Sequence, residues 1–351
     1  MAAKLTQIKK SLYVDDGLKR GPLTLFRLRA FPSSPFMLGQ CTDRQLALWN
    51  LEAEPRQVKK GEFVVGDLVC PHPAGWIRGF DVASSSDFIA TGGSDRTLRL
   101  WKWEGTRPSD KPVAQVAAHD GWVEAVAFSP DGSRLATVGA DRQLKLWEAG
   151  SLKLLQTAPA HTGYPRDLAW TPDGSKIVTG GEDGQLIVWN GADLQPVATI
   201  GFGEANDQQG QNPALTGVYR LAISRDGQWL AAGGAKLTAV FELATGRGVG
   251  MVKESGVDVA FHPRFDWLAM GENQLRVWSY EVAKFAPKAL SGDKDKEGRL
   301  KPLSLPALPG QEVANIKRND YGQGIAFLDG GRQMALGKAD GVVDLWEATE
   351  G

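Results

Sequence analysis

The chain has 351 residues, and its 40 Lys and Arg residues nearly balance its 41 Asp and Glu residues, giving a formal net charge of −1. A chain without excess charge creates no overall field that attracts nucleic acid or an anionic membrane, so composition argues against both kinds of partner. The two cysteines, Cys41 and Cys70, are too few for a disulfide scaffold or a thiolate zinc cluster. We expect both to be small buried side chains in strands.

The N-terminal segment has no apolar run of signal-peptide length, and no later segment approaches the roughly 20 apolar residues of a membrane span. We therefore expect a cytoplasmic protein without membrane insertion. Residues 5–11 form a single strand-like run that precedes the pattern described next.

A repeat of about 40 to 50 residues, a period that defines a repeat fold, dominates the rest of the chain. Each unit ends in a polar turn followed by alternating apolar and polar residues, as where Leu98 and Leu100 flank Arg99. A period of two predicts a half-buried strand. The seven units end at Trp49, Trp101, Trp147, Trp189, Phe241, Trp278 and Trp346.

A second signal lies upstream of these endings, where Pro-Asp-Gly separates two β-rich runs at residues 130–132 and again at residues 172–174. Proline presets one backbone angle and glycine accepts a positive φ, so this tripeptide predicts a hairpin turn. Each unit therefore reads as strand, hairpin, strand, Asp turn, strand and outer strand. This is a four-stranded antiparallel sheet.

Three units also carry a histidine, a threonine, a turn aspartate and the closing tryptophan in the same order. They are His72, Thr91, Asp95 and Trp101; His119, Thr137, Asp141 and Trp147; and His161, Thr179, Asp183 and Trp189. With these residues the chain resembles the WD-repeat β-propeller family, whose hallmark is a tetrad of these four side chains hydrogen-bonded in series. The other units depart from the pattern, and we expect their blades to rest on packing alone.

The resemblance implies an all-β fold in which residues 1–351 form a single seven-bladed propeller of four-stranded antiparallel blades. It also implies that the N-terminal strand completes the last blade as its outer strand, which closes the ring. Two insertions interrupt the blade spacing, at about 203–213 and about 283–317. The first is polar and predicts a loop, whereas Leu and Pro alternate over 302–309, as suits an extended segment lying along a blade.

The chain shows little sign of catalytic chemistry. Three of its four histidines belong to the tetrads, and we expect the fourth, His262, to point outward from a hairpin turn without a second metal ligand. No Gly-x-Ser-x-Gly motif occurs, and the Gly-rich segments lack the Lys-Ser or Lys-Thr pair of a phosphate-binding loop. We expect no cofactor, no metal and no enzyme activity.

In WD propellers the usual contact surface surrounds the central channel, on the face where the innermost strands begin. The resemblance places a set of aromatic and charged side chains there. They are Trp76, Arg78, Trp122, Glu124, Tyr164, Arg166 and Tyr321, with Leu25 and Arg27 at the matching place of the first blade. Aromatic residues and arginine are the commonest binding hot spots. Mixed charge favours a protein or peptide partner over a phosphate backbone.

The leading hypothesis is a non-catalytic scaffold that binds other proteins through this face as a subunit of a multiprotein assembly. The alternative is a small-ligand-binding or enzymatic propeller that uses the central channel, for which the sequence shows no converging polar groups. A nucleic-acid-binding protein would need a basic stripe, whereas we expect residues such as Arg99 and Lys145 to lie on a solvated surface.

Overall fold

The computed structural model describes residues 4–14, 25–31, 34–41, 44–53, 56–59, 62–84, 87–202, 217–253, 255–271, 274–285, 305–317, 324–338 and 342–349. Nearly all of these residues belong to β-strands or to the turns between them. Short 3₁₀ segments occur at η2 (Val282–Lys284) and η3 (Asp329–Gly331). The predicted loop at 203–213 and the predicted face residue Tyr321 lie outside the described residues.

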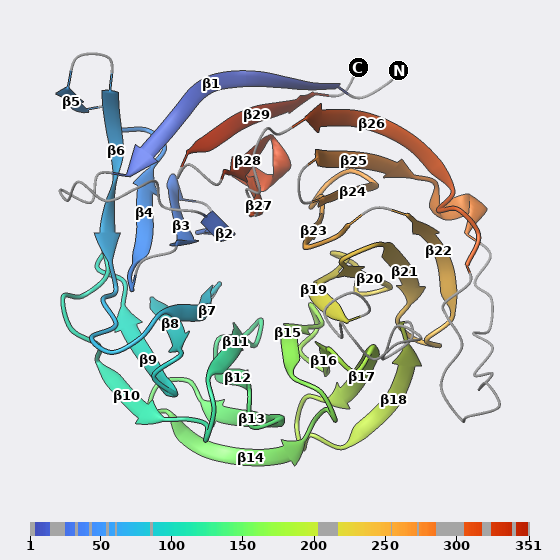
Figure 1. Cartoon of the computed structure of the whole chain (residues 1–351), viewed down its shortest axis with the longest axis horizontal. Helices are drawn as coiled ribbons and strands as arrows, with labels where there is room; N and C mark the ends of the chain where they lie inside the picture. The colour runs from blue at the N-terminus through green and yellow to red at the C-terminus, as the bar shows by residue number, and fades with distance from the viewer. Residues whose placement is uncertain are drawn as a thin grey trace, which may run out of the picture.

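Five separate four-stranded antiparallel sheets follow one another along the chain and around a ring (Figure 1). Each is one blade, with its first strand nearest the ring axis. The strands are β7 (Ile77–Val82), β8 (Phe88–Gly93), β9 (Thr97–Lys102) and β10 (Ala114–Ala117) in blade 2; β11 (Val123–Phe128), β12 (Arg134–Gly139), β13 (Gln143–Glu148) and β14 (Lys153–Pro159) in blade 3; β15 (Pro165–Trp170), β16 (Lys176–Gly181), β17 (Gln185–Asn190) and β18 (Pro196–Gly201) in blade 4; β19 (Val218–Ile223), β20 (Trp229–Gly234), β21 (Thr238–Glu242) and β22 (Gly248–Val252) in blade 5; and β23 (Asp258–Phe261), β24 (Trp267–Gly271), β25 (Gln274–Tyr280) and β26 (Gly310–Lys317) in blade 6.

A nine-stranded sheet makes up the first and last blades together. Its strands are β2 (Leu25–Ala30), β3 (Phe36–Cys41), β4 (Leu46–Asn50), β5 (Arg56–Lys59) and β6 (Glu62–Val69) in blade 1, and β27 (Ile325–Leu328), β28 (Gln333–Gly337), β29 (Val343–Thr349) and β1 (Lys4–Val14) in blade 7. The predicted seven-bladed propeller is thereby confirmed.

Strand β1 closes the ring. It pairs antiparallel with β29 as the outer strand of blade 7, and its last residues, Tyr13 and Val14, pair in parallel with Val64 and Gly66 of β6. The start of the chain is thus hydrogen-bonded to both the last and the first blade. Figure 1 shows this strand running along the outside of β29 and ending beside β6.

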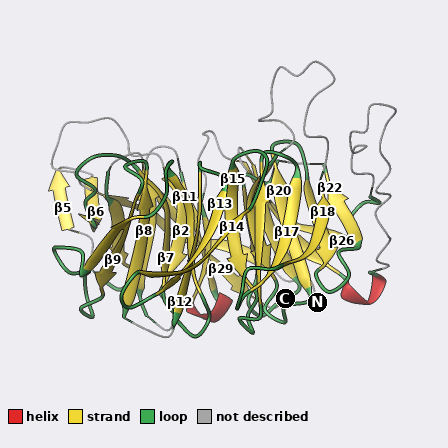
Figure 2. Ribbon diagram, turned by 90° about the horizontal axis from the view of Figure 1, so that it is seen from below, coloured by secondary structure: helices red, strands yellow, loops and turns green. Residues whose placement is uncertain are grey.

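All seven inner strands begin on the same side of the ring, which we call the entry face. It is uppermost in Figure 2 and faces the viewer in Figure 1, while both 3₁₀ segments lie on the opposite side. The four strands of each blade alternate in direction, so after four strands the chain is back on the face where the blade began. Residues at the starts of inner strands that are far apart in the sequence are therefore brought together around the ring axis.

The hydrophobic core lies between neighbouring blades. Leu98 and Leu100 of blade 2, for example, pack with Val123 and Trp147 of blade 3, and all four are at most 3 % exposed. Removing one tryptophan side chain from water favours folding by roughly 5 kcal/mol before the cost of ordering it. The strand-ending aromatic residue of each repeat is therefore a major source of contact between blades.

The segment expected to be an insertion, 283–317, contains a blade strand. Its last eight residues form β26, the outer strand of blade 6, so the extra residues end at Pro309. Residues 305–309 lie along β22 of blade 5, with Met251 N donating to Pro306 O over 2.9 Å and Leu308 N donating to Met251 O over 3.0 Å. The alternation of Leu and Pro thus marks an extended strap across the neighbouring blade.

His262 is buried, contrary to the expected outward position. It is 3 % exposed and stacks on Phe265 in the hairpin between β23 and β24. Its Nε2 donates to Gly331 O over 2.8 Å, and its Nδ1 accepts the backbone N–H groups of Arg264 and Phe265. The histidine ring thus hydrogen-bonds the backbone of two turns, one in blade 6 and one in blade 7. The sequence of a single hairpin does not reveal the contact with the second turn.

Candidate functional site

Blades 3 and 4 contain complete hydrogen-bonded tetrads. In blade 3, Trp147 Nε1 donates to Thr137 Oγ1 over 2.9 Å, Thr137 Oγ1 lies 2.8 Å from His119 Nε2, and His119 Nδ1 donates to Asp141 Oδ1 over 2.8 Å. Burial alone would raise the pKa of Asp141, but the hydrogen bond and charge of His119 outweigh it and lower that pKa. The tetrad of blade 4 repeats this geometry from Trp189 to Asp183.

Blade 2 has a variant of the tetrad. His72 and Trp101 contact Thr91 in the same way, but Arg99 Nη1 lies 2.9 Å from His72 Nδ1 and 2.8 Å from Asp95 Oδ2. His72 Nδ1 and Asp95 Oδ2 are 3.7 Å apart, so the arginine bridges them. Arg99 is 6 % exposed, so the prediction that it lies on a solvated surface was wrong. Alternation along a strand does not show whether its polar residues face solvent or are buried.

Three large aromatic side chains stand exposed on the entry face of the same three blades. Trp76, Trp122 and Tyr164 are 61 %, 49 % and 45 % exposed, and each immediately precedes an inner strand, β7, β11 or β15. Their equivalent positions in successive blades place them side by side along one arc of the ring. Most side chains of this size are buried in a folded domain, so three recurring exposures mark a surface feature.

Charged side chains connect this arc just inside the aromatic residues. Arg78 Nε donates to Glu124 Oε2 over 2.8 Å, and Arg166 Nη1 lies 3.6 Å from the same oxygen. Arg166 also pairs with Glu182. The guanidinium of Arg78 lies 4.8 Å from the ring centroid of Trp122, a cation–π contact. The two arginines are thereby held in place before any partner arrives.

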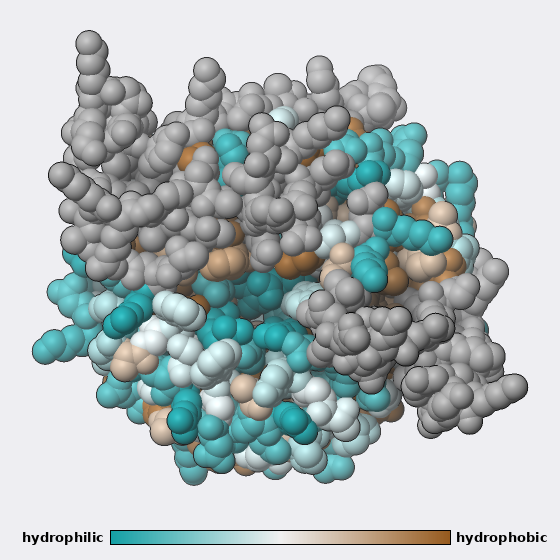
Figure 3. Space-filling model, viewed as in Figure 1, coloured by the Kyte–Doolittle hydropathy of each residue, from teal (hydrophilic) through white to brown (hydrophobic). Residues whose placement is uncertain are grey.

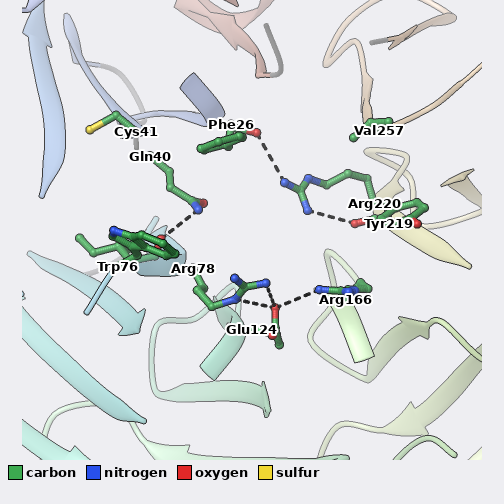
Figure 4. A pocket seen from close by; sticks show the side chains of 11 residues that line it. Phe26, Gln40, Cys41, Trp76, Arg78, Glu124, Arg166, Tyr219, Arg220 and Val257 are labelled. Carbon is green, nitrogen blue, oxygen red and sulfur yellow. Dashed lines mark hydrogen bonds and ion pairs between the residues drawn. The ribbon is translucent and has the colours of Figure 1, made fainter. Parts of the chain in front are cut away.

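A pocket of about 490 Å³ opens at the centre of the entry face. Figure 4 shows its lining side chains arranged around the opening, with Phe26 and Arg220 across from Arg78 and Glu124. Figure 3 shows hydrophilic and hydrophobic residues side by side near the centre of this face. The lining comes from six blades and consists of Phe26, Gln40, Cys41, Trp76, Ile77, Arg78, Glu124, Arg166, Tyr219, Arg220 and Val257.

The family comparison matches the blades that hold the tetrads. A model of the family described as WD domain, G-beta repeat matches residues 68–102, 110–148 and 152–190. The chain is a WD-repeat β-propeller. No curated protein matches the chain.

The other four blades of this WD-repeat propeller lack the tetrad hydroxyl. In blades 2 to 4 the tetrad hydroxyl belongs to a threonine of the second strand. This threonine pairs with the third-strand residue that lies two positions before the closing aromatic residue. In the remaining blades the residue at this place is Gly39, Ala232, Met270 or Leu336. The indole Nε1 atoms of Trp49, Trp278 and Trp346 accordingly have no hydrogen-bond partner among the described residues.

Below the pocket, charged side chains of the inner strands meet at the centre of the propeller. The sequence did not predict this cluster. Arg27, Asp167, Arg220 and Asp258 occupy equivalent positions of inner strands β2, β15, β19 and β23. Arg27 and Asp167, 4 % and 2 % exposed at their side chains, form a buried ion pair between blades 1 and 4. Charged residues inside otherwise apolar inner strands were the available signal, but the sequence does not show that they converge.

Burial and neighbouring charge act in opposite directions on these groups. Burial opposes ionisation of Asp167, but Arg27 and Arg220 outweigh it and lower the pKa of that carboxyl. At Asp81, which lies 3.4 Å from Arg29 one layer further in, burial prevails and raises the pKa. Asp81, Asp167 and Asp258 each also accept a backbone N–H from the inner strand of the next blade. The ionic centre therefore joins blades as well as pairing charges.

Neither a metal site nor a membrane segment is found in the described parts of the propeller. No group of three or more His, Cys, Asp or Glu side chains there is arranged to hold a metal ion. Likewise, none of the described helical segments is long and apolar enough to cross a membrane.

Proposed function

We propose that this propeller is a non-catalytic scaffold that binds another protein or a peptide on the entry face over blades 2 to 4. The observation that carries the proposal is the arc of Trp76, Trp122 and Tyr164, three exposed aromatic side chains on adjacent blades. WD-repeat propellers are in general protein-interaction scaffolds. We further propose that the protein is a cytoplasmic subunit of a multiprotein assembly.

The chemistry of the arc fits a binding hot spot. Tryptophan, tyrosine and arginine dominate the energetics of protein interfaces because they bury a large area with few rotatable bonds. Glu124 fixes Arg78 and Arg166 in position, so little conformational entropy is lost when a partner binds. The blades that carry the arc are those with tetrads, which supports the surface on a rigid base.

A small-ligand-binding propeller is the second candidate, favoured by the pocket of about 490 Å³ at the ring centre. This volume lies within the range of ligand-binding pockets. Three arginines and one glutamate line it, a charge balance that suits an anionic group.

The test is affinity purification from the native cell with wild-type protein and a triple variant, Trp76→Ala, Trp122→Ala and Tyr164→Ala. A matched control variant, Val113→Ala, Leu154→Ala and Val197→Ala, removes three exposed apolar side chains (53 %, 45 % and 57 %) from the outer edges of the same blades. We expect specific partners to be retained by wild type and control and lost from the triple variant, with unchanged melting temperatures. Partners that persist in the triple variant contradict the proposed face, and their complete absence from wild type favours the small-ligand candidate.

A further inference from the structure

Arg220 differs from the other four described arginines around the centre of the entry face. Arg27, Arg29, Arg78 and Arg166 each have a carboxylate within hydrogen-bonding distance. For Arg220 the nearest carboxylate atom is Asp258 Oδ1, 3.9 Å from its Nε. Its side chain is 18 % exposed and lines the pocket. This guanidinium thus has no carboxylate of the described residues within hydrogen-bonding distance, and its side chain lines the pocket.

The hydrogen bonds of Arg220 leave donors unused. Its Nη1 donates to Tyr219 O over 3.0 Å and its Nη2 approaches Phe26 O at 3.5 Å, while its buried Nε has no hydrogen-bond partner. Asp258 and Asp167 act on its charge from a distance, but none of the described carboxylates accepts a hydrogen bond from it. The buried Nε is out of reach of a ligand, but each terminal nitrogen carries a second N–H group that can donate to a ligand in the pocket.

Gln40, on another side of the pocket, has a hydrogen-bond acceptor without a donor in the described part of the chain (Figure 4). It is 8 % exposed, and its Nε2 donates to Ile77 O over 3.0 Å, which orients the amide. Its buried Oε1 has no hydrogen-bond partner among the described residues. The pocket therefore offers a fixed cation and a fixed hydrogen-bond acceptor to the same occupant.

The electrostatics of the pocket favour a single negative charge. Burial, followed by repulsion from Arg27, lowers the pKa of Arg220 to about 10, so an anion beside it relieves an existing penalty. A carboxylate matches the planar guanidinium with two hydrogen bonds. Glu124 lines the same pocket and opposes a second negative charge, which disfavours a phosphate.

We propose that this pocket receives an Asp or Glu side chain of the partner, whose carboxylate pairs with Arg220 while an adjacent backbone N–H donates to Gln40 Oε1. The proposal rests on the proposed function, because it names the kind of peptide that the entry face binds. Phe26 and Trp76 in the pocket lining pack against the aliphatic part of the inserted residue. The aromatic arc then contacts the flanking residues of the peptide.

The test begins with selection of a random displayed peptide library on the purified full-length protein. We expect the selected peptides to share an Asp or Glu at one position. The best peptide is then synthesised with Glu, Gln or phosphoserine at that position, and the affinity of each form is measured by fluorescence polarisation. We expect the Gln peptide to bind about tenfold or more weakly than the Glu peptide, as for loss of a charge-assisted pair, and the phosphoserine peptide to bind no better than the Gln peptide.

The same three peptides are measured against Arg220→Gln and against Arg107→Gln, a control arginine that is 62 % exposed at its side chain. Arg220→Gln should weaken the Glu peptide about tenfold or more and leave the Gln peptide nearly unchanged, so the two changes are coupled. Equal weakening of both peptides overturns the proposal. If Arg220→Gln does not fold, Gln40→Glu serves instead, since its carboxylate adds a negative charge to the pocket lining and should weaken the Glu peptide more than the Gln peptide.

The outcomes separate this proposal from the proposed function. Peptides that need the aromatic arc but share no acidic residue leave the proposed function standing and refute the acidic anchor. A library that yields no peptide sensitive to the Trp76, Trp122 and Tyr164 triple variant counts against both. Preference for phosphoserine over Glu refutes the carboxylate and identifies a phosphopeptide-binding pocket.

Discussion

Blades 2 to 4 and the other four blades form the same four-stranded sheet by different means. In blades 2 to 4 a threonine hydroxyl links the closing tryptophan to a histidine, and the family model matches these blades. In the others an aliphatic residue or glycine stands at the threonine position, yet Trp49 and Phe241 are completely buried. Backbone hydrogen bonds between strands and packing between blades therefore suffice for the fold. The tetrads add side-chain hydrogen bonds within three of the seven blades.

The blades without tetrads are held by contacts that reach across blades. Strand β1 joins blades 7 and 1, residues 305–309 lie along blade 5, and His262 bonds the turn of blade 7 from blade 6. The ion pair between Arg27 and Asp167 connects a blade of this kind to a blade with a tetrad. The tetrads thus add hydrogen bonds within blades 2 to 4, while contacts between blades occur on both sides of the ring.

The largest effect is expected where the two sides are joined. Asp167→Asn should lower the free energy of unfolding by about 3–5 kcal/mol, because it leaves Arg27 buried without its counter-ion. The control is Asp81→Asn, at a carboxyl whose pKa burial already raises and whose partner Arg29 is 39 % exposed at its side chain; we expect a loss below about 1 kcal/mol. Urea denaturation measures both, and equal losses would show that the buried pair does not join the two sides.

A smaller effect should distinguish a blade with a tetrad from one without. Thr137→Val keeps the shape of the side chain but leaves Trp147 Nε1 and His119 Nε2 without their shared partner, which should cost about 2–3 kcal/mol. Met270→Leu, at the equivalent position of blade 6, conserves volume and should cost less than about 1.5 kcal/mol. Thermal and urea unfolding of the two variants test this, and a harmless Thr137→Val would mean that the tetrad contributes nothing beyond packing.

The smallest expected effect is a pH dependence that arises from His262 in blade 6. Burial, aided by Arg264, lowers the pKa of this histidine from 6.5 to about 4. Between these values the unfolded chain binds a proton that the folded protein does not, so this contribution to stability is complete above pH 6.5 and lost as pH falls toward 4.

We therefore expect the urea midpoint to decrease from pH 7 to pH 5, a window above the titration of ordinary carboxyls. His262→Gln should flatten this slope, although the variant is less stable throughout. A slope identical to that of wild type would place the pH dependence elsewhere, with His72, whose pKa is likewise lowered to about 4, as the next histidine to replace.

The sequence by itself determined the seven blades, their strand order and the N-terminal closing strand. The blades and their strand order follow from local patterns: alternation along a strand, Pro-Asp-Gly in a hairpin, and an aromatic residue at the end of each repeat. The closing role of the N-terminal strand came from the resemblance to WD-repeat propellers. The same resemblance placed Trp76, Trp122 and Tyr164 at the starts of inner strands, where they are exposed side by side. Their role in binding remains a prediction.

Only the tertiary structure decided which polar residues meet outside the predicted tetrads. Arg27 and Asp167 are 140 positions apart and pair because ring closure brings their inner strands together around the axis. Arg99 and Arg220 look alike as polar members of a strand, yet one is inserted into a tetrad and the other lines a pocket, with its nearest carboxylate oxygen 3.9 Å away. Such differences depend on which side chains the folded chain brings together in space, which no repeat within the sequence encodes.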